Sequence, residues 1–409
     1  MSNLLIGLDI GSHTIKVVIG EVKRDNQPSL VDAFKMPSAG LRKGVVDDIS
    51  EVTQALSPVL SQVKKMGKAS DIGIFLGVGS GDVKVQSSIG VVAVSRADYE
   101  IYQDDVSRAI QSAQAINIPP NRMVLHSIVK EFIVDGVKDI RDPLGMIGNR
   151  LEVNSLIIDA FTPGIKNLSK CVEILGGNLS GLVLGALADA RAVLTKNQKE
   201  LGVALINIGF GKTSLCVFEE NKLLHAAVFP VGSGNITNDL AIGLKIPIET
   251  AEIIKLTFGS ALAREVSVRD AVELAKIDSK SKGTVPKKFI ADIIEVRLAE
   301  ILELVNNELK DTGKAGRLPA GVVLTGGGAK LPGVPDLARQ ELKLSAQIGI
   351  PTVSLLDIKS NEIAAKLEDP EFTCALGLLL TGHDRTVESR GARLSLRGVV
   401  KRMFKHFVP

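Results

Sequence analysis

Three short turns that contain glycine hold the residue types best suited to chemistry, and the chemistry they suit is the binding of an anion. The turns are Gly11-Ser12-His13-Thr14, Gly209-Phe210-Gly211-Lys212-Thr213 and Gly326-Gly327-Gly328, each after an apolar run. Backbone N–H groups can approach a phosphate closely at such a turn because glycine has no side chain to block the way. Taken singly, the first two turns are more typical of ordinary hairpins, and the third of a tight connection between a strand and a helix.

Two charged residues flank the first turn and could act on a phosphate. Asp9 ends the preceding apolar run and could order water molecules around Mg²⁺, a cation that keeps much of its hydration shell in proteins. Lys16 could neutralise phosphate charge as a compact cation. The second turn contains Gly211-Lys212-Thr213, like the end of a Walker A motif, but that motif needs glycine at position 206, where this chain has Ile206. A P-loop is therefore excluded.

Two strand–turn–strand units must position the first two turns. Apolar, β-branched runs over Leu4–Asp9 and Lys16–Val22 enclose the first turn, and runs over Val203–Ile208 and Ser214–Glu219 enclose the second. This repetition predicts a duplicated, two-lobed α/β protein. Further strands are expected over 72–78, 83–94, 124–137, 151–161 and 322–324, and helices over 50–66, 97–116, 164–175, 184–199, much of 236–310, and 334–343.

Composition excludes several classes of protein. Six positive charges and no acidic residue lie in 389–409, so the net charge of +3 leaves residues 1–388 at −3, and no basic stripe for nucleic acid runs through the body. The three cysteines lie far apart, which excludes a zinc or disulfide framework and favours a reducing cytosol. Neither a secretion signal nor an apolar run of membrane-spanning length is expected.

The end of the chain has the pattern of an amphipathic helix that binds a membrane surface. A polar segment, 384–393, is expected as a linker, and the helix follows it over 394–409. Its apolar face would carry Leu396, Val400, Met403, Phe404 and Phe407, and its cationic face Arg397 and Lys401 together with Arg402 and Lys405. Such a helix suits the interface of a membrane with anionic lipids. The alternative is a helix docked on the chain's own core or on a partner.

The three glycine turns, in this order and spacing, resemble a known set of motifs. Asp9-Ile10-Gly11-Ser12, Asn207 to Thr213 and Leu324-Thr325-Gly326-Gly327-Gly328 are similar to the phosphate-1, phosphate-2 and adenosine motifs of the actin/Hsp70/sugar-kinase superfamily. Within it, segments 38–47, 142–152 and 231–239 and the end of the chain resemble the bacterial cell-division family FtsA. The resemblance covers essentially residues 3–409.

This resemblance implies an actin-like fold with an inserted subdomain of the FtsA type. The first lobe would comprise 1–82, 164–200 and 356–383, and the insert 83–163. The second lobe would have a core of 201–245 and 314–355 and a helical subdomain of 246–313, followed by the linker 384–393 and the membrane-targeting helix 394–409.

The resemblance also implies a site for ATP with Mg²⁺. Its residues would be Gly11, Ser12, His13 and Lys16 in the first phosphate loop; Gly209, Gly211, Lys212 and Thr213 in the second; Gly326, Gly327 and Gly328 in the adenosine loop; and Asp9 at the metal. Glu252 and Lys255 match the helix that walls the ribose and base, and the alternative for them is a solvated i, i+3 pair.

Three positions depart from the family pattern. Asn207 and Ser214 stand where the family has acidic residues, and Gly185 stands where relatives carry Glu and actins carry the glutamine that orients water. Lys212, unusual in this loop, could replace part of the cation's charge. We therefore expect nucleotide binding with weak or absent hydrolysis, because a general base or water-orienting group contributes roughly 10²–10⁴ in rate.

The implied partners are FtsZ, further copies of the chain and anionic membrane lipids. Lys287, Lys288 and Arg297 lie near the patch that receives the acidic C-terminal peptide of FtsZ in this family, although plain solvation is the alternative for the two lysines. The implied function is an actin-like filament that tethers FtsZ to the cytoplasmic membrane at the division septum. The pilus-assembly relative of FtsA and a sugar- or acid-kinase-type phosphotransferase are the alternatives, and the tail disfavours both.

Overall fold

The computed structural model describes residues 4–23, 27–67, 72–351, 353, 356–358 and 360–393, and all structural statements concern these residues. The predicted helix over 394–409, with the membrane residues named above, lies outside them.

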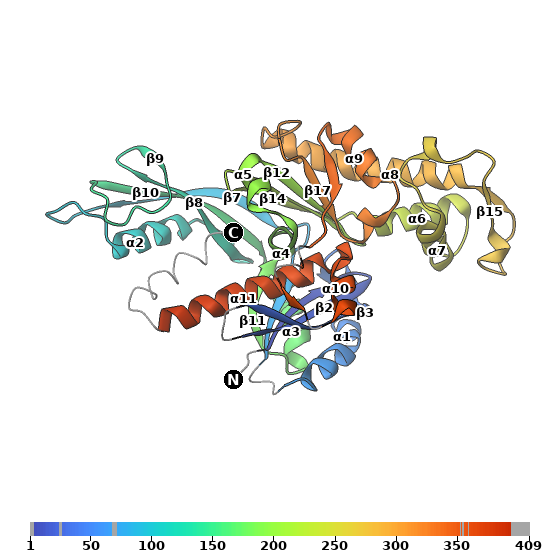
Figure 1. Cartoon of the computed structure of the whole chain (residues 1–409), viewed down its shortest axis with the longest axis horizontal. Coiled ribbons are helices and arrows are strands. Elements are labelled where there is room, and N and C mark those ends of the chain that lie inside the picture. The colour runs from blue at the N-terminus through green and yellow to red at the C-terminus, as the bar shows by residue number, and fades with distance from the viewer. Residues whose placement is uncertain are drawn as a thin grey trace.

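The first sheet has six strands in the order β11-β6-β1-β2-β3-β19 (Figure 1). The strands are β1 (Leu4–Ile10), β2 (Thr14–Val22), β3 (Pro28–Pro37), β6 (Ile72–Val78), β11 (Leu179–Leu184) and β19 (Asp357–Ile358). Ile6 and Leu8 of β1 pack with apolar residues of α1 (Ile49–Lys64) and α3 (Thr162–Ile174), whereas Leu5 belongs to a cluster on the opposite face. Both faces are therefore covered, which accounts for the nearly continuous apolar character of these strands.

The second sheet repeats the first. Its order is β14-β13-β12-β17-β18, and its strands are β12 (Val203–Ile208), β13 (Thr213–Glu219), β14 (Lys222–Phe229), β17 (Val322–Thr325) and β18 (Ala346–Ile348). β12 is antiparallel to β13 and parallel to β17, as β1 is antiparallel to β2 and parallel to β6. The prediction of a duplicated two-lobed core is therefore confirmed.

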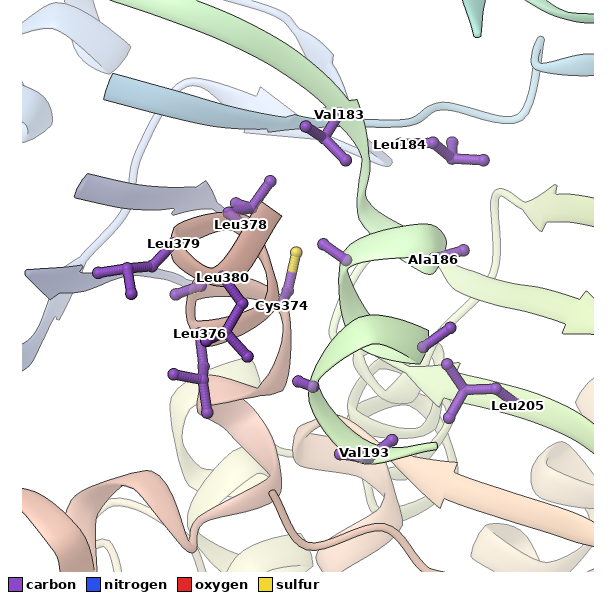
Figure 2. Packing of buried hydrophobic residues seen from close by; sticks show 14 of the residues in the cluster. Val183, Leu184, Ala186, Val193, Leu205, Cys374, Leu376, Leu378, Leu379 and Leu380 are labelled. Atoms are coloured by element: carbon purple, nitrogen blue, oxygen red, sulfur yellow. The ribbon is translucent and has the colours of Figure 1, made fainter. Parts of the chain in front are cut away.

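Two helices pack between the sheets. α4 (Gly185–Val193) and α11 (Thr373–Arg393) share one apolar cluster with β12, and Figure 2 shows Cys374 between the two helices and Leu205 of β12 beside α4. Gly377 of α11 is essential to this packing, because an added Cβ would lie 1.7 Å from the carbonyl oxygen of Ala188 in α4. α5 (Lys196–Leu201) and α10 (Asn361–Leu367) are short helices.

The insert has its own four-stranded sheet, in the order β7-β10-β8-β9, and extends to the left in Figure 1. Its elements are β7 (Lys84–Ala93), α2 (Gln103–Gln114), β8 (Arg122–Val134), β9 (Val137–Ile140) and β10 (Arg150–Phe161). α2 begins later than the expected 97, because Glu100 forms an isolated β-bridge with Ile147 and the N–H of Ile101 donates to the carbonyl of Met146.

The second lobe also has a largely helical part, at the right in Figure 1. Its elements are α6 (Ser233–Leu244), α7 (Ile248–Phe258), β15 (Ala271–Glu273), β16 (Thr284–Pro286) and α8 (Lys287–Asp311), and α9 (Val334–Leu342) packs on α8. The hairpin of β4 (Leu41–Arg42) and β5 (Val45–Val46) belongs to the first lobe, and one-turn 3₁₀ helices occupy Ala263–Glu265, Leu274–Lys276, Gly327–Lys330 and Pro370–Phe372.

The final described helix corrects one expectation. α11 runs to Arg393, so the segment 384–393 is helical rather than an irregular linker. The first turns of α11 pack on α4 and β1 through apolar residues, and the helix continues through residues whose polar composition had indicated a linker. Within the described ranges, each helix falls short of the combined length and apolar character that crossing a membrane requires.

Candidate functional site

A cavity of about 590 Å³ gathers the three glycine turns. Its volume lies within the range of small-molecule sites, roughly 300–1,000 Å³. The predicted residues that line it are Asp9, Gly11, Ser12, His13, Lys16, Gly209, Gly211, Lys212, Glu252, Lys255, Gly326, Gly327 and Gly328. Residues more than 300 positions apart in the sequence, such as Gly11 and Gly326, therefore share one cleft.

Thr213 is the one predicted nucleotide residue that the structure places elsewhere. It is fully buried, and its Oγ1 donates a hydrogen bond to the carbonyl of Val231 at 2.9 Å. Successive side chains of a strand point to opposite faces, so Lys212 and Ser214 line the cavity while Thr213 between them faces away. The side chain of Thr213 therefore faces away from the cavity, and its contact with the cofactor stays a prediction.

The first two turns have the same geometry and touch each other. The N–H of Gly11 donates to the carbonyl of Thr14, and the N–H of Gly209 donates to that of Lys212. A Cβ added at Gly211 would lie 2.5 Å from Ser12 Oγ, so only glycine permits this approach. Phe210 adds an aromatic contact that the sequence did not predict, because its ring stacks on His13 with 4.7 Å between centroids.

Cations come to the cleft from both lobes. Asp9, Lys16 and Lys35 are register partners across β1, β2 and β3, and all three line the cavity. Lys212 Nζ donates to the carbonyl oxygen of Gly79, at 2.5 Å, and so joins the second phosphate turn to the end of β6 in the first lobe. Lys35 was missed because its strand, over 28–37, was not predicted.

The third turn packs against the end of β12. Gly326 has a φ of +84°, and a Cβ added there would lie 2.2 Å from Asn207 Oδ1. Beyond the turn, Lys330 pairs with Asp369 at 2.7 Å and with Glu371 at 3.1 Å, and Glu371 also accepts from Lys35 at 3.0 Å. These ion pairs connect the two lobes at the lining of the cavity.

Glu252 and Lys255 form the expected pair on α7, but the pair is not a solvated one. The Lys255 side chain is 3% exposed, and its Nζ lies 2.6 Å from Glu252 Oε2 and 2.8 Å from Thr237 Oγ1. Burial lowers the pKa of Lys255, and the contact with Glu252 opposes that shift. Its Nζ also lies 5.3 Å from the centroid of the Phe210 ring, which connects α7 to the second turn.

Asp189 is a cleft residue that sequence reasoning missed. It is 1% exposed, its Oδ2 accepts from Asn207 Nδ2 at 2.7 Å, and its Oδ1 accepts from Thr373 Oγ1 at 2.7 Å. Burial raises the pKa of Asp189 to about 7, and the two hydrogen bonds oppose that shift. Its position four residues after Gly185 in a predicted helix was the available signal, because residues i and i+4 share a helix face.

The floor of the cleft has no side chain at position 185 that could orient water. Gly185 lies against Cys374, and a Cβ there would be 3.4 Å from Cys374 Sγ. Burial raises the pKa of the Cys374 thiol well above its usual value, with the charge of Asp9 acting in the same direction. A thiol held in this protonated state does not serve as a nucleophile.

The cleft carboxylates do not fit the expected Mg²⁺ well. Glu252 is paired with Lys255, Glu371 with two lysines, and Asp189 accepts from Thr373 and Asn207. Across the described ranges, no group of three or more His, Cys, Asp or Glu residues is arranged to hold a metal ion. Asp9, which lines the cavity beside the first turn, is left as the candidate.

The three predicted partner residues lie on α8, and two of them are already engaged. Arg297 makes a two-pronged contact with Asp239, at 2.6 and 3.0 Å, and a third with Glu300. Lys287 Nζ lies 3.3 Å from Asp270, so it is not simply solvated. Lys288 is half-buried. An acidic ligand of Arg297 would have to compete with Asp239.

Two family models match the chain. "Cell division protein FtsA" matches residues 204–377, and "SHS2 domain inserted in FTSA" matches residues 80–159, which cover most of the insert. The solved structure of a "PilM-PilN type IV pilus biogenesis complex" is similar with a TM-score of 0.65 and 18% identity, over 93% of this chain and 98% of that chain.

A second solved structure is similar in fold, and a relative is similar in sequence over most of its length. MreB5 of Spiroplasma citri, bound to AMPPNP, is similar with a TM-score of 0.56 and 14% identity, over 96% of this chain and 99% of that one. The cell division protein FtsA of Bacillus subtilis (strain 168) is 36% identical over 378 residues, which are 92% of this chain and 83% of the relative. The duplicated sheets, the inserted SHS2 domain and this identity over most of both chains show that the protein belongs to the FtsA family of actin-like cell-division proteins.

Proposed function

We propose that this protein binds ATP in its cleft, assembles with itself, and tethers FtsZ filaments to the cytoplasmic face of the membrane at the division septum. One observation carries the nucleotide part of the proposal. Glycine turns from three distant parts of the sequence converge on a single cavity of about 590 Å³. The same fold in MreB5 is bound to AMPPNP, which supports a nucleotide as the occupant.

Each side of the cleft would have its own task. The two hairpin turns would present N–H groups to the phosphates, and Lys16 and Lys212 would supply positive charge. The third turn and α7 would hold the sugar and base. Gly185 offers no side chain to orient an attacking water, so nucleotide would act mainly as a structural switch, and turnover would be weak.

Equilibrium titration with a fluorescent ATP analogue tests the nucleotide site. Gly211→Val should abolish binding, because the new side chain would collide with Ser12 and separate the two phosphate turns. Gly164→Ala is the control, since a Cβ there lies no closer than 3.9 Å to a neighbour. Equal affinity of Gly211→Val and the native protein would contradict the site.

The proposed FtsZ contact lies on α8, at Lys287 and Lys288 in its first turn and at Arg297 further along the helix. The acidic C-terminal peptide of FtsZ would replace Asp239 as the partner of Arg297, because a carboxylate makes the same two-pronged contact. Arg297→Ala should weaken peptide binding by roughly tenfold, or about 1.4 kcal/mol. Arg339→Ala, which removes another helical arginine with an i, i+3 partner, should leave it unchanged. Equal losses in both variants would refute the contact.

The proposed membrane anchor is the segment 394–409, with Phe404 and Phe407 on its apolar face and Arg397 and Lys401 among its cations. Each lysine or arginine near an anionic surface contributes about 1 kcal/mol. Deleting 394–409 should therefore abolish co-sedimentation with anionic vesicles, and neutral vesicles should bind the full chain much less. Undiminished sedimentation of the truncated chain would rule out this anchor.

A further inference from the structure

We propose that this cleft binds its nucleotide without a divalent cation, with lysines supplying the positive charge on the phosphates. The inference rests on the proposed nucleotide site and specifies its electrostatics. It follows from a disagreement between the residues present and the Mg²⁺ that the actin-like fold implies.

The position from which the second phosphate motif would address a cation is closed. Asn207 stands there, and its Nδ2 donates to Asp189 Oδ2 at 2.7 Å. Its Oδ1 faces the third turn, since a Cβ added at Gly326 would lie 2.2 Å from that oxygen. Asn207 is thus used to join β12 to α4 and to the third turn.

Asp189 cannot readily act as a metal ligand in place of Asn207. Both of its oxygens accept hydrogen bonds from the protein, one from Asn207 and one from Thr373 at 2.7 Å. Thr373 in turn lies 2.9 Å from Thr325, and both threonines are fully buried. Mg²⁺ is usually held through one or two carboxylates, several waters and the phosphates themselves. Turning Asp189 toward a metal would break a buried network.

Positive charge is already present where a cation would act. Lys212 lies in the second phosphate turn, between Gly211 and the start of β13, and its Nζ reaches the carbonyl of Gly79 across the cleft. Lys16 comes from the opposite hairpin, directly across from Asp9. Both lysines line the cavity together with Asp9 and Asp189.

These four charged groups, Asp9, Asp189, Lys16 and Lys212, lie around the floor of the cleft. The buried thiol of Cys374 at the cleft floor feels all of them: Asp9 and Asp189 raise its pKa, and Lys212 and Lys16 lower it. Because burial raises the pKa of Asp189 to about 7, the two lysines outweigh the two acids in charge near neutral pH without a metal. A phosphate chain that enters here meets two ammonium groups, whereas a dication would be repelled by both.

The experiment measures the affinity of the full chain for a fluorescent ATP analogue in excess magnesium chloride and in excess EDTA. We expect the two dissociation constants to agree within roughly threefold, a difference of about 0.7 kcal/mol. A loss of tenfold or more in EDTA would overturn the inference while leaving the nucleotide site intact. Absence of binding in both conditions would instead overturn the proposed function, and the inference with it.

Two variants test whether Lys212 takes the place of the metal in nucleotide binding. Lys212→Met should weaken binding by tenfold or more in EDTA, because it removes one cation and keeps the length of the side chain. The double variant N207D/K212T should bind tightly only with magnesium, because it exchanges a lysine for a carboxylate. Circular dichroism verifies that each variant is folded. If Lys212→Met binds in EDTA as the native chain does, the lysine does not replace the metal and the inference fails.

Discussion

Replacing Asp189 with asparagine should remove a strong pH dependence of stability. Asp189 is a nearly inaccessible carboxyl group between α4, β12 and α11, and burial raises its pKa to about 7. The amide introduced by Asp189→Asn is neutral at every pH and has nearly the same shape as the carboxyl group. Its oxygen can accept the hydrogen bond from Thr373, and its NH₂ group requires only that the Asn207 amide turn over.

The sign and size of the effect follow from linkage. Below pH 3.8 the carboxyl group is protonated in both folded and unfolded chains, and it costs nothing. As the pH rises from 3.8 to 7, Asp189 ionises in the unfolded chain but stays protonated in the folded one. The free energy of unfolding therefore falls, and the destabilisation reaches its full size above about pH 7. Each unit corresponds to about 1.36 kcal/mol, so the total is about 4 kcal/mol.

Urea unfolding followed by circular dichroism, at a series of pH values from 4 to 8, measures this directly. The free energy of unfolding of the native chain, minus that of D189N, should fall by about 4 kcal/mol across the range. Other titrating groups cancel in the difference. Asp292→Asn, which changes an exposed carboxylate on α8, is the control and should give a nearly flat difference.

A flat difference for D189N would refute the reasoning. It would mean that the folded chain ionises Asp189 as easily as the unfolded one does, so that Asp189 is not isolated from water. A steeper fall at higher pH would place the pKa above 7 but keep the explanation.

Two further predictions concern the packing that holds the cleft together. Gly377→Ala should destabilise the protein by roughly 3 kcal/mol or more in thermal unfolding, since the new Cβ would lie 1.7 Å from the Ala188 oxygen, whereas Gly164→Ala in α3 should be neutral or slightly stabilising. Burial lowers the pKa of His126 to about 4, so the folded state should lose about 3 kcal/mol of stability as the pH falls from 6.5 to 4. In urea titrations, His126→Leu should flatten this dependence of the unfolding free energy on pH. The variant also loses the hydrogen bond that His126 accepts from the N–H of Leu184.

Local patterns predicted the elements that carry the phosphate turns. β12 begins and ends where its apolar run indicated, β1 begins where predicted and ends one residue later, and the two hairpins lie where glycine interrupts such runs. The repeated strand–turn–strand unit was enough to predict the duplicated core, because each unit is encoded within about 20 residues.

Elements buried on every side were harder to predict. α11 begins Thr373-Cys-Ala-Leu-Gly-Leu-Leu-Leu and packs on α4 and β1, so its first turns show no polar face and no helical period. β3 and β11, which are only partly buried, were missed as well, although Lys35 of β3 reaches the cleft.

Contacts between distant residues were beyond sequence reasoning. The bond from Lys212 to Gly79 joins residues 133 positions apart, and that from Thr373 to Asp189 joins residues 184 positions apart. The motif also suggested Thr213, whose side chain is turned away from the cavity by the alternation of the strand.

The most direct test of the cleft is backbone hydrogen exchange, measured by mass spectrometry on the full chain with and without ATP. If one nucleotide binds all three turns, peptides that contain residues 9–14, 207–213 and 324–328 should exchange more slowly together, at the same ATP concentration. Protection of one turn alone, or of a surface remote from the cleft, would contradict a nucleotide site shared by the two lobes.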